Sequence, residues 1–186
     1  MSPDLAIVLF VIAALVGVVI LLLMALLKRQ EAQGGDQTTY AGLEEFILVD
    51  PETGLYNRRF FHKKLEEEIY RSARYNAYFS LAIFDLSRIL SDLEKDRAIT
   101  LLRKLGTTAA RDTRFTDIVA RIDEYKIALV LSMTPRRVAT IPLERLRAKL
   151  KEVLQLEGIE ADIPYELHAY PDDKATIEKL SISMRP

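Results

Sequence analysis

The chain contains no cysteine, and only two of its 186 residues are histidine. The absence of cysteine excludes disulfide bonds, thiolate metal sites and cysteine nucleophiles. Neither His62 nor His168 has an acidic residue and a nucleophile nearby in sequence, so the pattern does not favour a hydrolytic triad. The formal net charge is −1 and no basic tract is present, which argues against nucleic acid as a partner.

One long stretch has no charge at all, because residues 5–27 ("LAIVLFVIAALVGVVILLLMALL") are apolar or glycine. A bilayer core needs roughly 20 such residues in a helix, so this stretch predicts a transmembrane helix over residues 5–27. A cleaved signal peptide is the alternative, but its apolar region is shorter and follows a basic residue, whereas Lys28 and Arg29 come after this one. Since basic residues stay on the cytoplasmic side, we expect residues 1–4 outside and the remainder inside.

After this stretch, residues 28–45 are largely polar and contain glycine, which predicts a juxtamembrane linker. From residue 46 onward, apolar residues recur with helix and strand periods in turn. We expect a helix from Asn57, a buried central strand over residues 77–84 and a second helix around residues 99–109. Two strands, residues 118–122 and 127–131, follow with four turn residues between them, which is hairpin spacing.

A third helix is expected to start near Thr140, with Pro142 in its first turn, where proline is tolerated. A strand over residues 163–170 follows, and Pro164 favours an edge position for it. The residues after Pro171 suffice only for a small helix. The order of helix, strand, helix, strand, hairpin turn, strand, helix and strand predicts an α+β domain over residues 46–186, with about four strands and helices on one or both faces.

Two motifs of this domain resemble those of diguanylate cyclase (GGDEF) domains. "DPETGLYNRRFF", from Asp50 to Phe61, resembles the entry signature D-x-L-T-G-L-x-N-R-R, with Glu52 where leucine is usual. "DIVARI", residues 117–122, resembles the run before the signature hairpin. The resemblance covers residues 46 to about 172. It implies a bacterial protein with a GGDEF-like fold of the nucleotidyl-cyclase or palm type, a mixed sheet with flanking helices, from a family that condenses two GTP molecules into cyclic di-GMP.

The residues that this family uses for catalysis are largely absent here. Both glycines of the signature hairpin are missing, and Lys126 stands at the position of the metal-binding acid. Asp85 keeps the first acid after the central strand, but Ser87 replaces the second, and the family's C-terminal Y-x-A-K-x-x-G-R-N segment is missing. We therefore expect a degenerate, C-terminally shortened GGDEF domain over residues 46–186, with no enzyme activity, no metal and no cofactor. The five hairpin positions are Asp123, Glu124, Tyr125, Lys126 and Ile127.

A ligand-binding motif of the family remains in register. Many cyclases have a product-inhibition site, Arg-x-x-Asp, five residues before the hairpin, and here Arg114 and Asp117 occupy its positions. The planar fork of arginine binds a guanine edge or a phosphate with two hydrogen bonds, and a carboxylate accepts from guanine N–H groups. The family site usually has a further arginine, for which Arg145 is the candidate and Arg147 the alternative. A solvated salt bridge or a cap is the other interpretation of the Arg-x-x-Asp pair.

These features predict an inactive, membrane-anchored domain that binds cyclic di-GMP as a regulatory ligand through Arg114, Asp117 and Arg145. We expect a single-pass protein of the bacterial inner (cytoplasmic) membrane, with residues 1–4 in the periplasm and residues 5–27 in contact with lipid. The expected partners are other inner-membrane proteins of an envelope secretion or exopolysaccharide complex, and a homo-oligomer is also open. The alternative is a ligand-independent membrane scaffold that keeps only the fold, or that pairs with an active cyclase.

Overall fold

The computed structural model describes residues 48–185. The predicted transmembrane helix at residues 5–27 and the predicted linker at residues 28–45 lie outside this described part. Among residues 48–185, no helix combines the length and the apolar composition needed to cross a bilayer. Residues 47–186 form one compact unit.

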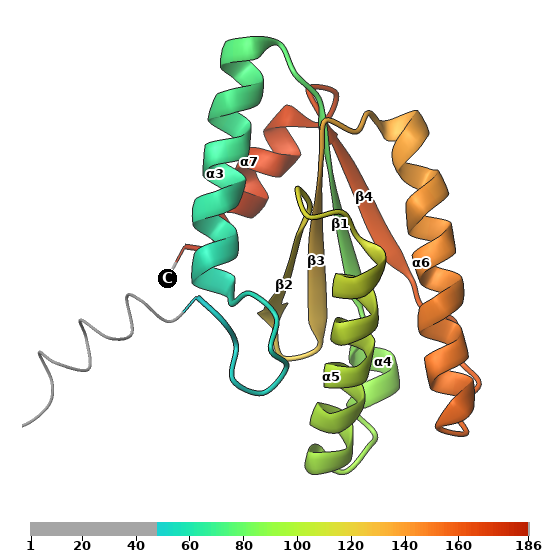
Figure 1. Cartoon of the computed structure of the whole chain (residues 1–186). Coiled ribbons are helices and arrows are strands. Elements are labelled where there is room, and N and C mark those ends of the chain that lie inside the picture. Colours follow the sequence, from blue (N-terminus) through green and yellow to red (C-terminus); the bar gives the residue numbers. More distant parts are fainter. Residues whose placement is uncertain (1–47, 186) are drawn as a thin grey trace, which may run out of the picture. The chain divides into compact units, whose positions relative to one another are not determined.

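Four strands form one sheet in the order β2-β3-β1-β4 (Figure 1). The α+β class is confirmed, but the expected mixed sheet is wrong, because all three strand pairings are antiparallel. β2 runs in the same direction as β1, yet β3 lies between the two. A parallel contact to β2 comes from outside the four strands, where Tyr56 forms an isolated bridge with Ala120. The strands are β1 (Phe79–Asp85), β2 (Ile118–Asp123), β3 (Lys126–Ser132) and β4 (Tyr165–Tyr170).

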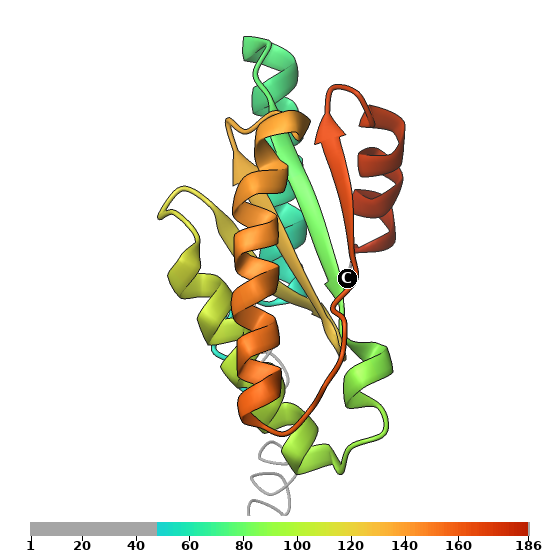
Figure 2. The same ribbon diagram turned by 90° about the vertical axis from the view of Figure 1, so that its right-hand side faces the viewer.

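Helices cover both faces of the sheet (Figures 1 and 2). α3 (Arg58–Tyr75) and α7 (Lys174–Ser183) lie on one face, and α5 (Lys95–Asp112) and α6 (Arg136–Leu156) lie on the other. The short helix α4 (Ser87–Leu90), which the sequence pattern did not predict, follows β1.

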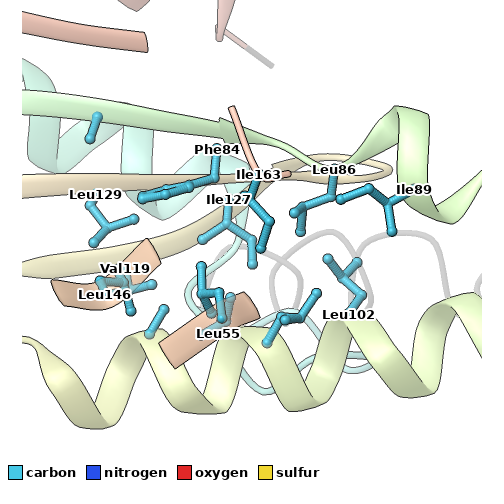
Figure 3. Packing of buried hydrophobic residues seen from close by; sticks show 14 of the residues in the cluster. Leu55, Phe84, Leu86, Ile89, Leu102, Val119, Ile127, Leu129, Leu146 and Ile163 are labelled. Atoms are coloured by element: carbon cyan, nitrogen blue, oxygen red, sulfur yellow. The ribbon is translucent and has the colours of Figure 1, made fainter. Parts of the chain in front are cut away.

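The central strand β1 is buried on both sides, as its apolar run predicted. Successive side chains of a strand point to opposite faces, so Phe79 and Leu81 belong to different layers from Ala82 and Phe84. Phe79 and Leu81 pack into the core under α3 and α7. Ala82 and Phe84 pack into the core under α5 and α6, where Figure 3 labels Phe84. The residues of both cores lie between Leu55 and Met184, so the fragment of residues 47–186 carries its own core and is expected to fold alone.

The helix starts were predicted with mixed success. Asn57 caps α3, because its Oδ1 accepts a 2.8 Å hydrogen bond from the backbone N–H of Phe60, as expected for this residue type. α6 begins at Arg136, so the expected start near Thr140 is wrong. Burial of Ala139 against the sheet stabilises the first turns of α6, and Pro142 is accommodated inside the helix although it cannot donate to the carbonyl four residues earlier.

The β2–β3 hairpin is tighter than predicted. The strands extend to Asp123 and Lys126, which pair with each other, so the turn has two residues instead of four. A register shift between Arg121 and Asp123 makes this pairing possible. β4 begins directly after Pro164 and lies at a sheet edge, as predicted.

Candidate functional site

The Arg-x-x-Asp segment forms a tight turn between α5 and β2. The N–H of Asp117 donates to the carbonyl of Arg114, and the N–H of Arg114 donates to the Asp117 carboxylate, each at 3.0 Å. The other carboxylate oxygen of Asp117 accepts from the N–H of Ser132 at the end of β3, at 3.3 Å. Asp117 therefore fixes this turn against the sheet and retains unused acceptor positions on both oxygens.

All three predicted ligand-binding residues line one hollow of about 210 Å³. Arg114 and Asp117 come from the α5–β2 turn, and Arg145 comes from α6 on the other side. Leu129 and Leu146 belong to the core beneath it. Pockets that enclose drug-sized ligands measure roughly 300–1,000 Å³, so a dinucleotide at this hollow has to lie partly on its rim.

The two arginines of the hollow differ in their contacts. The guanidinium of Arg114 makes no hydrogen bond or ion pair with any residue in the described part of the chain. Arg145 is bound to Asp112, with Nε 3.0 Å from the Asp112 carboxylate and Nη2 3.1 Å from its carbonyl oxygen. A ligand can bind Arg114 directly, but it has to compete with Asp112 for Arg145.

Asp112 is the residue of this site that sequence reasoning missed. Its side chain is 8% exposed and forms ion pairs with both Arg145 and Lys149. Burial by itself raises the pKa of this carboxyl, but Lys149 and Arg145 outweigh burial and hold the pKa below its ordinary value. Asp112 stands 33 residues before Arg145, and no periodic pattern links the end of α5 to the middle of α6.

The alternative candidate, Arg147, points away from the hollow. Its Nη2 donates to both carboxylate oxygens of Asp162, each at 2.7 Å, and Arg147 does not line the hollow. Of the two arginines that the sequence offered on α6, the structure brings only Arg145 to the candidate site.

The hairpin tip is tied to the rest of the domain by charged side chains. Lys126 Nζ lies 3.3 Å from the carboxylate of Asp85, its cross-strand partner in β1. Burial raises the pKa of Asp85, but hydrogen bonds from Ser87 and the charge of Lys126 outweigh this and lower it. Within residues 48–185, no three histidine or acidic side chains cluster in a way that could hold a metal ion.

Arg121 connects this tip to the loop before α3. Its guanidinium donates to the carbonyl oxygens of Asp123 and Glu124 at 3.1–3.3 Å, and to the carboxylate of Asp50 at 3.2 Å. It also pairs with Glu52, and its own side chain is 12% exposed. In the sequence, Arg121 is part of the "DIVARI" run, and an arginine in a largely apolar strand already signals a need for an acidic partner.

Comparison with known proteins identifies relatives in both sequence and structure. The chain is 29% identical over 135 residues to the diguanylate cyclase DgcP of Pseudomonas aeruginosa, covering 69% of this chain and 20% of DgcP. It is 27% identical over 122 residues to the uncharacterized membrane protein YdaK of Bacillus subtilis, covering 62% of this chain and 42% of YdaK. The chain thus spans less than half the length of these relatives.

Solved structures share the fold. The coiled coil and GGDEF domain of DgcB from Caulobacter crescentus, in complex with c-di-GMP, has a TM-score of 0.59 and 15% identity, covering 87% of this chain and 91% of that one. The diguanylate cyclase SiaD in complex with its activator SiaC, from Pseudomonas aeruginosa, has a TM-score of 0.56 and 19% identity, covering 97% and 73%. The family model "Diguanylate cyclase, GGDEF domain" matches residues 47–182. The chain belongs to the GGDEF domain family.

Proposed function

We propose that this chain is a catalytically inactive, membrane-anchored GGDEF domain that binds cyclic di-GMP and passes the bound state to a partner. One observation carries the proposal: Arg114, Asp117 and Arg145 line the same hollow, and the Arg114 guanidinium is unpaired in the described residues. An unpaired arginine can bind a phosphate or a guanine edge without first breaking another contact. Solved proteins of the same fold, such as DgcB, are in complex with c-di-GMP, which supports this class of ligand.

The proposed loss of catalysis rests on the geometry around Asp85. Phosphoryl transfer by this type of chemistry requires a divalent cation held by carboxylates next to the phosphates. Here the ammonium group of Lys126 lies 3.3 Å from Asp85, so the protein supplies its own cation at this carboxylate. Side chains at Asp123 and Glu124 also stand where the family has glycines that allow close approach of a nucleotide to the backbone.

Lys126→Glu is expected to convert this ion pair into a divalent-cation site. Two carboxylates then face each other across the strands, which destabilises the fold by about 0.2–1 kcal/mol relative to a neutral pair when no metal is present. Millimolar Mg²⁺ or Mn²⁺ is expected to reverse this loss, because oxygen ligands suit both ions. Thermal unfolding with and without metal measures the effect. Lys126→Gln is the control and should not respond to metal; an equal response of both variants would contradict the argument.

Calorimetry on the fragment of residues 47–186 tests the proposed function. Titration with cyclic di-GMP is expected to give saturable binding in the micromolar range or tighter. The same fragment, mixed with GTP and Mg²⁺, is expected to form no cyclic di-GMP, as measured by chromatography. An absence of binding at tens of micromolar overturns the receptor proposal, and formation of cyclic di-GMP overturns the proposed inactivity.

Asp112→Asn is expected to tighten cyclic di-GMP binding about three- to fivefold. The change releases Arg145 from an ion pair of the partly exposed kind, which stabilises by up to about 1 kcal/mol, and makes its guanidinium available to the ligand. Asp162→Asn is the matched control, because it releases Arg147 outside the hollow and should leave affinity unchanged. Equal affinities for the wild type and Asp112→Asn would show that Arg145 does not contact the ligand.

The proposed location and partners extend the same hypothesis. The apolar run at residues 5–27 supports an inner-membrane anchor, and an envelope secretion or exopolysaccharide complex is the proposed partner. The complex of SiaD with SiaC supports a protein partner, because it shows that a protein with this fold associates with another protein.

A ligand-independent scaffold is the second candidate. It is favoured by two contacts that need no ligand, the bonds of Asp117 to backbone N–H groups and the pairing of Arg145 with Asp112. A partner complex that survives unchanged in Arg114→Ala, together with absent cyclic di-GMP binding, would support this candidate over the receptor.

A further inference from the structure

Apolar side chains stand exposed around the mouth of the Arg114 hollow. Phe115 is fully exposed, Ile141 is 71% exposed and Met133 is 65% exposed. Figure 2 shows the α5–β2 connection, which carries Phe115, projecting from the body of the domain. Single exposed apolar residues are ordinary on protein surfaces, but a group of them beside one another marks an interaction site. We call Phe115, Met133, Val138 and Ile141 the apolar rim.

Hydrogen bonds hold the parts of the apolar rim together. Ser132 donates from its Oγ to the carbonyl of Thr116 at 3.1 Å, which joins the chain next to Met133 to the chain next to Phe115. Val138 and Ile141 line the same hollow as Arg114, the neighbour of Phe115. The rim residues therefore lie on three neighbouring segments, the α5–β2 loop, the β3–α6 turn and the first turns of α6.

The methionine at position 133 does not contribute to the stability of the fold. Its φ is 52°, in the left-handed region that glycine and asparagine occupy at much lower conformational cost. Methionine at this position is strained and also places an apolar side chain in water. Neither feature stabilises the domain, so an interaction with a partner is the simpler explanation.

The charge around the rim is basic. Arg114 and Arg137, one helical turn before Ile141, have no ion pair within residues 48–185. The nearby acids are already engaged, because Asp112 pairs with Arg145 and Lys149 and Asp117 accepts from backbone N–H groups. A symmetric contact between two copies places unpaired arginines near each other, so charge complementarity favours an anionic partner.

We infer that the apolar rim, with Arg114 and Arg137, docks the domain on an anionic lipid bilayer. Exposed aromatic and aliphatic side chains enter the headgroup region, while arginines beside them contact lipid phosphates. The inference rests on the proposed anchor, because the predicted transmembrane helix ends at residue 27 and the domain begins 20 residues later. Twenty residues reach at most about 70 Å even when fully extended, so a domain anchored in this way stays near the bilayer.

Arg114 then binds two kinds of anionic ligand, the nucleotide and the lipid phosphates. Cyclic di-GMP at Arg114 covers the centre of the basic-apolar surface, so the nucleotide and the bilayer exclude each other. The ligand thereby releases the domain from the membrane. Release from the bilayer is then the response of the proposed receptor to cyclic di-GMP.

The chain has no tryptophan, so Phe115→Trp provides a single fluorescent reporter in the fragment of residues 47–186. Vesicles of phosphatidylglycerol and phosphatidylcholine are expected to shift its emission to the blue, and vesicles of phosphatidylcholine alone are not. Leu156→Trp is the control, because Leu156 is 87% exposed and lies roughly 20–30 Å from the rim along α6. An absent shift, a shift in neutral vesicles, an equal shift in Leu156→Trp, or a shift caused by protein concentration alone overturns the inference.

Two further variants separate this inference from the proposed function. Arg137→Glu is expected to weaken vesicle binding about tenfold or more and to change cyclic di-GMP affinity much less, because Arg137 does not line the hollow. Met133→Gly is expected to weaken vesicle binding with no loss of thermal stability, which excludes misfolding as the cause. Added cyclic di-GMP is expected to release the fragment from vesicles. If the fragment of residues 47–186 binds no cyclic di-GMP but still binds anionic vesicles, the receptor proposal fails and the membrane-docking inference stands.

Discussion

Arg114→Ala is expected to weaken cyclic di-GMP binding by about 10- to 100-fold. Hydrogen bonds to charged groups contribute roughly 1.5–3 kcal/mol each, and 1.4 kcal/mol corresponds to a tenfold change in affinity. The guanidinium of Arg114 has no partner in the described part of the fold, so its removal leaves the apoprotein intact. Calorimetry on the fragment of residues 47–186 gives the affinity, and thermal unfolding is expected to show no change in stability.

Arg147→Ala is the matched control for this measurement. Arg147 also belongs to the polar surface of α6, but it pairs with Asp162 and lies outside the hollow, so its loss is expected to leave affinity unchanged. Equal losses of cyclic di-GMP affinity in Arg114→Ala and Arg147→Ala would indicate that affinity depends on overall positive charge and not on a specific contact. Full retention of binding in Arg114→Ala would place the ligand elsewhere.

Local sequence patterns predicted most of the fold correctly, because they depend on interactions between residues that are close in sequence. The helix start at Asn57 and the buried central strand β1 both depend on residues a few positions apart, and both are present. The start of α6 was predicted too late because proline was interpreted by its local preference alone. The burial of Ala139, which depends on the sheet packed against it, was not visible in the sequence.

The candidate site was predictable only where a motif kept its spacing. Arg114 and Asp117 were predicted by register, and Arg145 was predicted because the family site usually has a further arginine; the structure places all three at one hollow. Asp112 was not found, since its role depends on two helices that pack against each other after folding. The apolar rim was also not found, because Phe115 and Ile141 have the composition of core residues and only the structure shows that they are exposed.

Arg121→Ala is expected to lower the free energy of unfolding by about 2–4 kcal/mol. Removal of one partner from a buried ion pair costs roughly 3–5 kcal/mol, and the range is lower here because Asp50 is 18% exposed and Glu52 is 43% exposed. The change also leaves the carbonyl oxygens of Asp123 and Glu124 without their donor. Urea titration of the fragment of residues 47–186 measures the loss. Glu52→Gln is the control and should cost less than 1 kcal/mol.

The stability difference between wild type and Arg121→Ala is expected to shrink in acid. Burial raises the pKa of Asp50, but hydrogen bonds from Thr53 and the charge of Arg121 outweigh burial and lower the pKa below its ordinary value of about 4. A lowered pKa in the folded state stabilises the protein above that ordinary value, and the contribution is lost as the pH falls through the folded-state pKa. The difference is therefore largest above about pH 5 and decreases below about pH 4. A constant difference down to pH 3 would show that Arg121 acts mainly through the hairpin carbonyls and not through Asp50.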